Sequence, residues 1–532
     1  MKNFILFVLF CAAIAPAKEI TDLQGMINRQ IAEGKKTITI PSGRYYVKPV
    51  KRAHLTFSGL SDITIIADGV EMICTETTRA VTIEYCTNFT LRGMTIDYDP
   101  LPYTQGKIVK ISNDRMSHEV EIFKGYPPAD SAYAMKHAVF DAKTRRLKFG
   151  NYYTFKTEAL PSNRLLITKG EPERKKDAGE QVGDLIVVAS KFAPNGEMPH
   201  TVYCDNSVGT TLENITLYSA PIFGFLEVHC DGSVYRGCVV DRRSPETDYV
   251  QREPRLRSLN ADAYHSKFAR KGPQILNCTA GFMGDDCVNI CGAYHLITQG
   301  TGDTLRVLAK TNMDIAAGDP VELTTVDGRR ILSATVLSVK AVGKTTKDET
   351  AGLKDLPLLE RIRGFLKEAY EIKIDREIDV PFGSVIASEN RMGNGFSVKD
   401  CTFGNNRSRG ILAKGSDGEI SGNRIENAFM QAIKIAPEYQ WLESGYSRNV
   451  LIKNNTIINC GMEAVFVHAF GEFPAHENIS IINNSIQTDF SPVISIHGLR
   501  GGTISGNAVK TMNGGRVRNP VELNHCDDVT VQ

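Results

Sequence analysis

The segments Asn454-Asn455-Thr456-Ile457-Ile458 and Asn483-Asn484-Ser485-Ile486 decide the fold class of this chain. Each joins an asparagine turn to a short apolar strand, and earlier copies are Asn88-Phe89-Thr90-Leu91 and Asn214-Ile215-Thr216-Leu217. The imperfect repeat has a period of roughly 20 to 25 residues, as expected for one rung of a β-helix. Asparagine suits such turns because it can also hydrogen-bond to the next rung. The sequence therefore predicts an all-β protein built on a right-handed parallel β-helix (solenoid).

Two stretches interrupt the repeat. From about Gly106 to Pro199, and again from about Ile297 to Phe382, alternating strands are separated by charged loops. Long decorated loops are the alternative, but loops of ~90 residues without structure are rare in compact proteins. We expect two inserted small antiparallel β-barrels. The chain then divides into a signal peptide (1–17), the N-terminal part of the β-helix with a capping helix (18–105), the first barrel (106–200), the β-helix with the catalytic aspartates (201–296), the second barrel (297–385) and the C-terminal part of the β-helix (386–532).

The first residues predict export. Met1-Lys2-Asn3, the apolar run from Phe4 to Ile14, and Ala15-Pro16-Ala17 are the charged, apolar and small-residue parts of a secretory signal. Cleavage after Ala17 is the natural interpretation. A membrane anchor is the alternative, but a span needs ~20 apolar residues. We therefore expect export to the periplasm or the cell exterior of a Gram-negative bacterium.

A cap is expected at the start of the β-helix. Asp22 to Glu33 has the pattern of a short amphipathic helix that ends at Gly34, and Thr37-Ile38-Thr39-Ile40 follows as a strand. The open end of a stacked-strand core exposes unpaired backbone groups. We expect the helix to cover that end.

Charge and cysteine content narrow the function classes. The 62 Lys and Arg balance 61 Asp and Glu, which is not the basic footprint of a nucleic-acid-binding protein. A neutral sugar is compatible with that balance. Removal of Cys11 with the signal leaves eleven of the 12 cysteines, most in apolar settings such as Asn277-Cys278-Thr279. We expect buried free thiols rather than a disulfide framework, and no catalytic cysteine.

The densest polar signal is Asn260-Ala261-Asp262, followed one rung later by Gly284-Asp285-Asp286. Asp262 precedes Asp285 by 23 positions and Asp286 by 24. With that period the two segments stack on adjacent rungs, about 4.8 Å apart along the axis. Side chains of a regular strand alternate in direction, so Asp285 and Asp286 can share a site only at a turn or strand end, and Gly284 permits such a bend. The sequence predicts three converging carboxylates.

Clustered carboxylates suit acid-base catalysis. Their repulsion raises the pKa of one member, which then serves as a general acid near neutral pH. Glycoside hydrolysis needs such an acid for the leaving oxygen and a base that activates water. An Asp pair alone is more often a turn or a calcium ligand, but the Asn-x-Asp one rung earlier is more specific, and no further ring of calcium ligands is identifiable. We predict an enzyme whose three aspartates act without a metal.

These motifs resemble two families of glycosidases. Polygalacturonases combine Asn-x-Asp and Asp-Asp with Gly-His-Gly and Arg-x-Lys, but this chain has no Gly-His-Gly and no Arg-x-Lys at a comparable place. The chain more closely resembles glycoside hydrolase family 110, the α-1,3-galactosidases, over nearly its whole length, both inserts included. The resemblance implies that Asp285 is the general acid and that Asp262 and Asp286 position and deprotonate water. It also implies galactose as the sugar, inversion of configuration, no cofactor and dimerisation.

Other polar residues are candidates for binding the sugar. Trp441, the only tryptophan, suits either stacking on a galactose face or local packing. His265 equally suits holding a catalytic aspartate. Each of the others is by itself typical of a solvated edge residue. The full set is Trp441, His265, Glu227, Arg409, Lys414, Lys434 and Glu463.

The leading hypothesis is an inverting exo-α-1,3-galactosidase acting on blood-group B or linear α-1,3-galactosyl glycans. The alternatives are another β-helix glycosidase, such as a polygalacturonase-like enzyme, and a non-catalytic glycan-binding solenoid, which has no reason to gather three acids. The expected partners are an oligosaccharide or glycoconjugate substrate and a second copy of the chain in a homodimer. No nucleic acid and no membrane span are expected.

Overall fold

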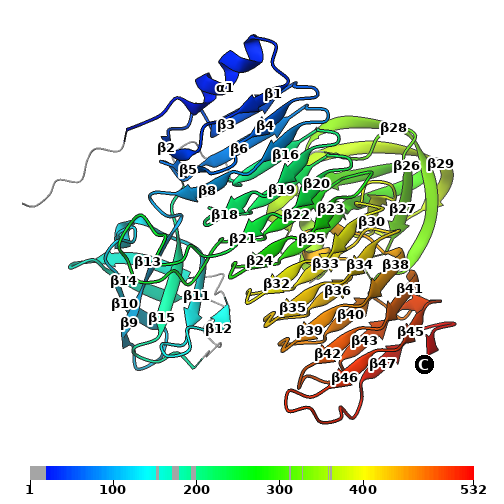
Figure 1. Cartoon of the computed structure of the whole chain (residues 1–532). Coiled ribbons are helices and arrows are strands. Elements are labelled where there is room, and N and C mark those ends of the chain that lie inside the picture. The colour runs from blue at the N-terminus through cyan, green and yellow to red at the C-terminus, as the bar shows by residue number, and fades with distance from the viewer. Residues whose placement is uncertain are drawn as a thin grey trace, which may run out of the picture.

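The computed structural model describes residues 19–150, 155–170, 179–192, 199–310, 313–325, 327–356, 359 and 362–532. The predicted signal peptide therefore lies outside the described residues. Three long sheets of short parallel strands stack along one axis and form the body of the molecule (Figure 1). The predicted parallel β-helix is confirmed.

The strands of the β-helix fall into three sheets that we number 1 to 3. Sheet 1 has 12 strands: β3 (Ala53–Ser58), β6 (Arg79–Glu84), β16 (Val202–Asp205), β19 (Phe225–Val228), β22 (Tyr264–Lys267), β25 (Val288–Ala293), β33 (Ile411–Ala413), β36 (Ile433–Ile435), β37 (Glu443–Ser444), β40 (Val465–His468), β43 (Ile494–His497) and β47 (Val521–Asn524). Sheet 2 has 13 strands: β1 (Thr37–Thr39), β4 (Thr64–Ile66), β7 (Thr90–Arg92), β17 (Thr211–Glu213), β20 (Val234–Arg236), β23 (Gln274–Leu276), β31 (Ser397–Lys399), β34 (Glu419–Ser421), β38 (Arg448–Lys453), β41 (His476–Ile482), β44 (Leu499–Arg500), β45 (Thr503–Ser505) and β48 (Thr530–Val531). Sheet 3 has 11 strands: β2 (Gly43–Val47), β5 (Val70–Cys74), β8 (Thr95–Tyr98), β18 (Thr216–Leu217), β21 (Val239–Val240), β24 (Thr279–Gly281), β32 (Thr402–Gly404), β35 (Arg424–Glu426), β39 (Thr456–Ile458), β42 (Ser485–Gln487) and β46 (Ala508–Lys510).

Each rung runs from sheet 1 through sheet 2 to sheet 3, and each strand pairs in parallel with its counterpart on the next rung. In sheet 1, Phe225 lies opposite Tyr264, which lies opposite Val288, which lies opposite Ile411. These four side chains point inward and belong to one continuous apolar core. Because side chains alternate along a strand, the neighbouring positions of sheet 1 point outward.

Buried asparagines stack where sheet 2 turns into sheet 3. The backbone N–H of Asn423 donates to Asn455 Oδ1 at 3.0 Å, and that of Asn455 donates to Asn484 Oδ1 at 2.9 Å. The neighbouring Asn454 has a φ of 55°, and Asn88 has a φ of 50°, both in the left-handed region. The predicted use of asparagine for turns and for bonds between rungs is confirmed.

The predicted cap is present. Helix α1 (Leu23–Ala32) begins after Asp22, whose side chain accepts a hydrogen bond from the backbone of Gly25. Leu23 and Ile27 are buried in the core at the first rung. Among the described residues, no helix has both the length and the apolar character to cross a membrane.

The first insert leaves the β-helix between β8 and β16. It consists of β9 (Tyr103–Ile111), β10 (Ser117–Ile122), η1 (Ala129–Ser131), β11 (Ala132–Phe140), β12 (Leu147–Gly150), β13 (Phe155–Leu160), β14 (Arg164–Lys169) and β15 (Leu185–Ser190). Its strands form one antiparallel seven-stranded sheet in the order β12-β11-β15-β9-β10-β14-β13. Strand β11, near one edge, contacts β13 at the other edge, so the sheet curls back on itself.

The second insert leaves the β-helix between β25 and β31. It consists of β26 (His295–Ala309), β27 (Pro320–Thr324), β28 (Arg330–Lys344), η3 (Ala351–Asp355), η4 (Arg363–Phe365), β29 (Glu368–Asp379) and β30 (Val385–Ser388). The strands close into a barrel in the order β26-β29-β28-β27-β30. The closed antiparallel barrel predicted for this stretch is confirmed.

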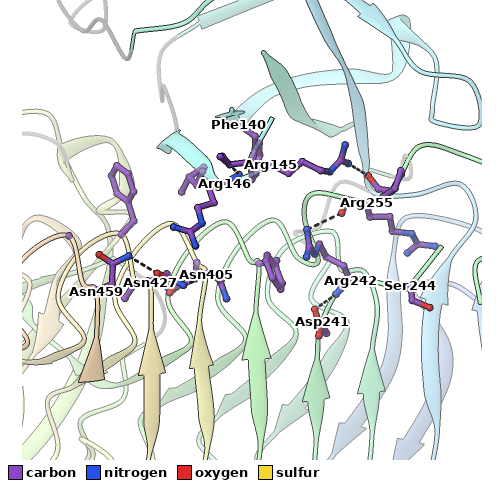
Figure 2. A pocket seen from close by; sticks show the side chains of 18 of the residues that line it. Phe140, Arg145, Arg146, Asp241, Arg242, Ser244, Arg255, Asn405, Asn427 and Asn459 are labelled. Atoms are coloured by element: carbon purple, nitrogen blue, oxygen red, sulfur yellow. Dashed lines mark hydrogen bonds between the residues drawn. The ribbon is translucent and has the colours of Figure 1, made fainter. Parts of the chain in front are cut away.

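A cleft of about 790 Å³ lies between the first insert and the turns that join sheet 3 to sheet 1 (Figure 2). Arg146, on the turn between β11 and β12, faces Asn405 and Asn427 on the β-helix, whereas the neighbouring Arg145 reaches the carbonyl of Pro254. The three aspartates do not line this cleft.

The cysteines of the described chain are free thiols. Ten of the eleven are buried and Cys526 is half-buried. Cys238, Cys278 and Cys401 point into the core of the β-helix, where each sulfur bonds to a backbone carbonyl. The predicted buried free thiols are confirmed.

The asparagine stack gives a prediction for stability. Asn455→Ala removes the acceptor of the Asn423 N–H and the donor to the Ile420 carbonyl, 3.0 Å away, in a buried place. We expect the free energy of unfolding to fall by about 2 kcal/mol or more, because unsatisfied buried polar groups cost about 1–3 kcal/mol each. Chemical denaturation measures this. The exposed Asn519→Ala is the matched control, and equal stability of the two variants would contradict a structural role for the stack.

Candidate active site

The three aspartates lie at the start of two neighbouring strands of sheet 1. Asp262 precedes β22, and Asp285 and Asp286 precede β25, with Tyr264 in register with Val288. One carboxylate oxygen of each aspartate lies within 4.8 Å of those of the other two. The predicted convergence of the three carboxylates is present.

A glycine allows the two turns to pack. The backbone N–H of Gly284 donates to the carbonyl of Leu259 at 2.9 Å. A Cβ at position 284 would lie 2.6 Å from the carbonyl oxygen of Asn260, closer than atoms can approach. Gly284 therefore lets the turn of Asp285 and Asp286 lie directly against the turn of Asp262.

His265 holds Asp262. Its Nδ1–H donates to Asp262 Oδ2 at 2.6 Å, and both side chains are buried. Burial lowers the pKa of His265 well below its usual range, so the ring is neutral at pH 7. The ring stacks on Phe223 at 4.6 Å between centroids, and Phe223 stacks on His200 at 4.8 Å. Of the two roles that the sequence left open for His265, the structure shows contact with the aspartate.

Two arginines from the turn before β33 accompany the other aspartates. Arg407 Nη1 donates to Asp285 Oδ1 at 3.1 Å. Asp286 Oδ1 accepts the backbone N–H of Arg409 at 2.8 Å and lies 3.3 Å from its Nε. The amide of Asn406 donates to the backbone carbonyls of Asp285 and Arg409, each at 2.8 Å. This turn therefore fixes both aspartates and supplies positive charge to each.

The three carboxylates differ in burial, and the pKa of Asp286 is raised. Burial raises the pKa of Asp286 to about 7, against the opposing effect of Arg409, and the carboxylates of Asp262, Asp285 and Glu438 raise it as well. Because the groups interact strongly, the proton belongs to the set and not to one residue. The set therefore retains one proton close to neutral pH.

A line of polar side chains continues from the aspartates along the β-helix. The first residue of each of the strands β22, β25, β33, β36 and β40 faces inward and pairs with the first residue of the next strand. Two positions before these paired residues stand, in order, Asp262, Asp286, Arg409, Gln431 and Glu463. Gln431 Nε2 donates to Glu463 Oε2 at 3.0 Å. The structure thus brings the predicted Arg409 and Glu463 into one row with the aspartates.

Glu438 links that row to the next. Its carboxylate accepts Arg409 Nη2 at 2.9 Å and Lys434 Nζ at 2.8 Å. Burial raises the pKa of Glu438, but Arg409, Lys434 and Lys414 outweigh it, so the pKa lies below its usual value and the group is ionised. Lys434 lies on the outward face of β36, as expected of a substrate-facing position.

Lys414 lies beneath a loop and not on the open face. Its Nζ donates to Asn289 Oδ1 and to Glu443 Oε2, each at 2.9 Å, and the residue is fully buried. Burial lowers the pKa of Lys414, but Glu443 more than compensates, so Lys414 is charged. Strand β37, which carries Glu443, pairs antiparallel with β25. This buried position does not support the predicted contact of Lys414 with a sugar, because the Lys414 side chain instead anchors the loop that carries Glu443.

Glu227 lies inside the β-helix. Its carboxylate accepts Tyr235 Oη at 3.0 Å and Ser266 Oγ at 2.5 Å in the buried core. Burial raises the pKa of Glu227. The structure does not bring Glu227 to the outer face that carries the aspartates. The reason is that the Glu227 side chain points into the core, a direction that the sequence did not reveal.

Trp441 lies on the loop between β36 and β37. It ends the short helix η5 (Tyr439–Trp441) and is half-buried. Lys310, from the second insert, donates its Nζ to the Trp441 carbonyl at 2.8 Å and lies 5.5 Å from the centre of the indole ring. Trp441 therefore stands where the loop meets the second insert.

The sequence did not indicate Arg407, Gln431 or Glu443. A signal for Gln431 existed, since it follows Arg409 by one rung, 22 positions later. Arg407 comes from an irregular turn and Glu443 from the short strand β37, which runs antiparallel to β25, and the repeat does not place such residues.

Among the described residues, two groups of side chains lie close enough together to hold a metal ion. They are the aspartates and the set His265, Cys291 and Glu443, with candidate ligand atoms within 4.8 Å of one another in each. Burial raises the pKa of Cys291 to about 12, so its sulfur remains a thiol, which is a poor ligand. Lys414 already neutralises Glu443. Two guanidinium groups lie beside the aspartates, whereas calcium prefers six to eight oxygen ligands. Both groups favour ion pairs over a metal.

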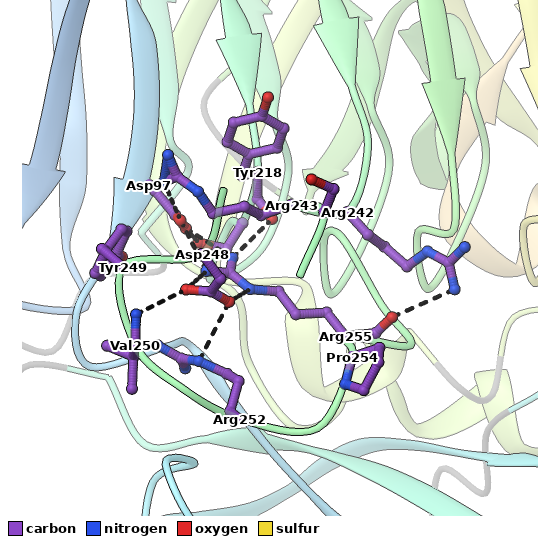
Figure 3. Close-up of polar contacts among 12 residues, drawn as sticks. Asp97, Tyr218, Arg242, Arg243, Asp248, Tyr249, Val250, Arg252, Pro254 and Arg255 are labelled. Carbon is purple, nitrogen blue, oxygen red and sulfur yellow. Dashed lines mark hydrogen bonds and ion pairs between the residues drawn. The ribbon is translucent and has the colours of Figure 1, made fainter. Parts of the chain in front are cut away.

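The chain that leads to Asp262 is anchored by a buried network (Figure 3). Arg255 donates to both oxygens of Asp97, at 3.0 and 2.9 Å, and its Nε donates to Asp248 at 3.0 Å. Arg243 adds a bond to Asp97 at 3.2 Å. Removing one partner of a buried ion pair leaves an uncompensated charge, which is strongly destabilising. The network therefore fixes the segment before Asp262 against β8.

Comparison with known proteins first defines the fold. A family model described as the right handed beta helix region matches residues 382–516, so the β-helix is right-handed as predicted. Among solved structures, the A-module of the mannuronan C-5 epimerase AlgE4 of Azotobacter vinelandii is 10% identical with a TM-score of 0.41, covering 95% of this chain and 96% of that one.

Curated relatives then give the specific resemblance. Alpha-1,3-galactosidase B of Bacteroides thetaiotaomicron is 22% identical over 489 residues, which are 85% of this chain and 74% of the relative. Alpha-1,3-galactosidase B of Parabacteroides distasonis is 22% identical over 550 residues, covering 91% and 84%. Alpha-1,3-galactosidase A of Bacteroides thetaiotaomicron is 22% identical over 518 residues, covering 91% and 84%. The resemblance to α-1,3-galactosidases that the sequence predicted is confirmed.

The pKa of Asp286 gives a pH-dependent prediction. A folded-state pKa of about 7 exceeds the ~3.9 of an unfolded aspartate. The protonated carboxyl therefore adds stability that is fully present below the unfolded pKa and is lost as the pH rises through 7. Asp286→Asn cannot titrate, so we expect its melting temperature, relative to wild type, to increase from about pH 5 to about pH 8. The exposed Asp348→Asn is the control. A difference independent of pH would show that Asp286 does not titrate between pH 5 and pH 8 in the folded protein.

Proposed function

We propose that this chain is a glycoside hydrolase that removes terminal α-1,3-linked galactose from glycans. The observation that carries the proposal is the cluster of three carboxylates within 4.8 Å, one of which has a pKa of about 7. Such a cluster supplies both an acid and a base near neutral pH. The names of the curated relatives support galactose and the α-1,3 linkage.

The roles of the aspartates follow from exposure and from the resemblance. The side chain of Asp285 is 20% exposed, against 5% for Asp262 and 3% for Asp286. We therefore assign Asp285 as the acid that protonates the leaving oxygen, because it is the one most open to a bound glycan. Asp262 and Asp286, buried side by side, hold and deprotonate the water.

This assignment requires the shared proton to move. In this structure the raised pKa falls on Asp286, the residue that the proposal assigns to the water. A glycosidic oxygen can accept a hydrogen bond only from a protonated Asp285, so a bound substrate favours the proton there. Arg409 then compensates the ionised Asp286. Movement within a coupled set is expected, since the location of the proton depends on each microstate.

Side chains in the polar row serve the sugar hydroxyls. Arg409, Lys434 and Glu438 form an ion-paired set next to Asp286. Gln431 and Glu463 extend the row with an amide and a carboxylate. Charged groups that already hold one another in place accept and donate hydrogen bonds to hydroxyls with little reorganisation. We propose that the terminal galactose lies across this row, and that Trp441 borders it.

Inversion is the finer proposal. The pairing of Asp262 and Asp286 supports one shared water, and the resemblance points the same way. The spacing points in the other direction: oxygens within 4.8 Å are nearer to the ~5–5.5 Å of retaining enzymes than to the ~6.5–9.5 Å of inverting ones. Blood-group B and linear α-1,3-galactosyl glycans both fit the proposal. Export to the periplasm or the cell exterior, and dimerisation, stay predictions from the sequence.

The roles of the aspartates predict different responses to the leaving group. Wild type should release galactose from galactose-α-1,3-galactose and from α-galactosyl fluoride. Asp285→Asn should lose ~10²–10⁴-fold in kcat/KM on the disaccharide but far less on the fluoride, because fluoride departs without a proton. Asp262→Asn and Asp286→Asn should lose activity on both. Measurement of released galactose gives these values.

Controls separate the alternatives. Asp348→Asn, exposed on the second insert, should retain wild-type turnover. Equal losses of Asp285→Asn on both substrates would place the acid elsewhere. Cleavage of polygalacturonate instead of galactosides would establish the polygalacturonase-like alternative, and glycan binding without turnover would establish the non-catalytic one. Prolonged chelation should leave the rate unchanged.

The stereochemistry of the product tests the order of bonds made and broken. Direct displacement by water should give β-galactose first from an α-galactoside. Proton NMR before mutarotation distinguishes the two anomers. Initial α-galactose, or a trapped glycosyl-aspartate, would mean double displacement and would make one of the three aspartates the nucleophile.

A further inference from the structure

The cleft between the first insert and the β-helix is separate from the row of aspartates. It has a volume of about 790 Å³. One wall is the turn between β11 and β12, and the other is the set of turns from sheet 3 to sheet 1, including Phe282, Asn427 and Phe429 (Figure 2). Neither the aspartates nor the loop of Glu438 line it.

Positive charge dominates the lining of this cleft. Five arginines line it, and Asp241 is the one carboxylate among the described lining residues. Two of the arginines, Arg243 and Arg255, are already paired with Asp97. The whole chain is close to neutral, with 62 basic and 61 acidic residues, so this local excess does not follow from composition.

Three arginines have no recorded ion pair with a carboxylate in the described part of the chain. Arg145 donates to the carbonyl of Pro254 at 2.7 Å, and Arg242 donates to the carbonyl of Arg255 at 3.3 Å. Arg146 is exposed and points from the insert toward the asparagines of the opposite wall (Figure 2). Burial lowers the pKa of Arg242, the neighbouring carboxylate of Asp241 opposes this, and the charge of Arg145 adds a smaller lowering effect. Like charges held together in this way would be stabilised by a bound anion.

The opposite wall offers groups that suit a sugar. Asn427 Nδ2 donates to Asn405 Oδ1 at 3.0 Å, and Asn459 Nδ2 donates to Asn427 Oδ1 at 2.6 Å, which forms a ladder of amides along the cleft. Phe429 is 38% exposed, and the guanidinium of Arg242 lies 3.4 Å from the ring centre of Phe282. Amides bind hydroxyls, and aromatic faces pack against the apolar face of a sugar.

We propose that this cleft binds an acidic glycan segment, with a carboxylate or sulfate among Arg145, Arg146 and Arg242 and the sugar ring over the asparagine ladder. The guanidinium groups suit planar carboxylates and sulfates because they donate paired hydrogen bonds. The site holds glycan without cutting it. It goes beyond the proposed hydrolysis and does not depend on it, because binding is measured without turnover.

The test is calorimetric titration of the full chain with three trisaccharides: neutral α-galactotriose, α-trigalacturonate and a sulfated galactotriose. At least one acidic trisaccharide should bind about tenfold or more tightly than the neutral one. Arg146→Ala and Arg242→Ala should each weaken that binding about tenfold, whereas Arg376→Ala, with a side chain 60% exposed on the second insert, should not. Turnover of a neutral aryl α-galactoside should be unchanged in these variants.

The pattern across the probes decides the proposal. Preference for the carboxylate or for the sulfate identifies the acidic group. Equal affinity for neutral and acidic trisaccharides, or acidic binding that survives Arg146→Ala, would overturn the proposal. Tighter binding of a single-stranded oligonucleotide than of either acidic trisaccharide would also overturn it, in favour of phosphate recognition. Should Arg242→Ala fail to fold, the exposed Arg146→Ala still gives the answer.

Discussion

The parallel backbone pairing between rungs is the constraint on which the rest of the structure depends. It places residues that are one rung apart in the sequence next to each other in space. The register between the strands is fixed, because a shift by one residue would turn the core side chains outward. Tyr264 and Val288 are paired in this way, and the aspartates that precede them are therefore brought together. The candidate active site is thus a consequence of the repeat, and Gly284 permits the close approach of the two turns that carry the aspartates.

Three carboxylates placed close together repel one another, and positively charged side chains from the neighbouring rungs offset this repulsion. Arg407 and Arg409 come from the rung after the aspartates in space, although the second insert separates them by more than a hundred residues in sequence. Glu438 forms one ion pair with Arg409 and another with Lys434. The outer face of sheet 1 therefore carries charges of both signs next to each other. Burial is the main cause of the raised pKa of Asp286, and the repulsion that remains among the carboxylates adds to it.

The sequence could predict what depends on the repeat and little of what depends on irregular turns. The β-helix, the capping helix and the meeting of Asp262 with Asp286 follow from period and pattern. Glu227 could not be assigned a direction, because the apolar residues around it fit either face of a strand. Lys414 is covered by a loop whose course has no repeat to follow. In the first insert, alternating strands were evident, but the curled seven-stranded sheet depends on pairings that alternation does not specify.

The turns between sheet 3 and sheet 1 contribute to two different surfaces, the face that carries the aspartates and the cleft beside the first insert. On the outer face of sheet 1, each charge beside the aspartates has a partner of opposite sign. In the cleft beside the first insert, the positive charges of Arg145, Arg146 and Arg242 outnumber Asp241, the one carboxylate among the lining residues that the structure describes. Asn406 joins the two, because it lines the cleft while its amide holds the carbonyls of Asp285 and Arg409. The backbone of this turn is therefore common to both surfaces. The side chains that determine the charge of each surface are different residues. The charge of either surface can therefore change by substitution without a change in the backbone of the rungs.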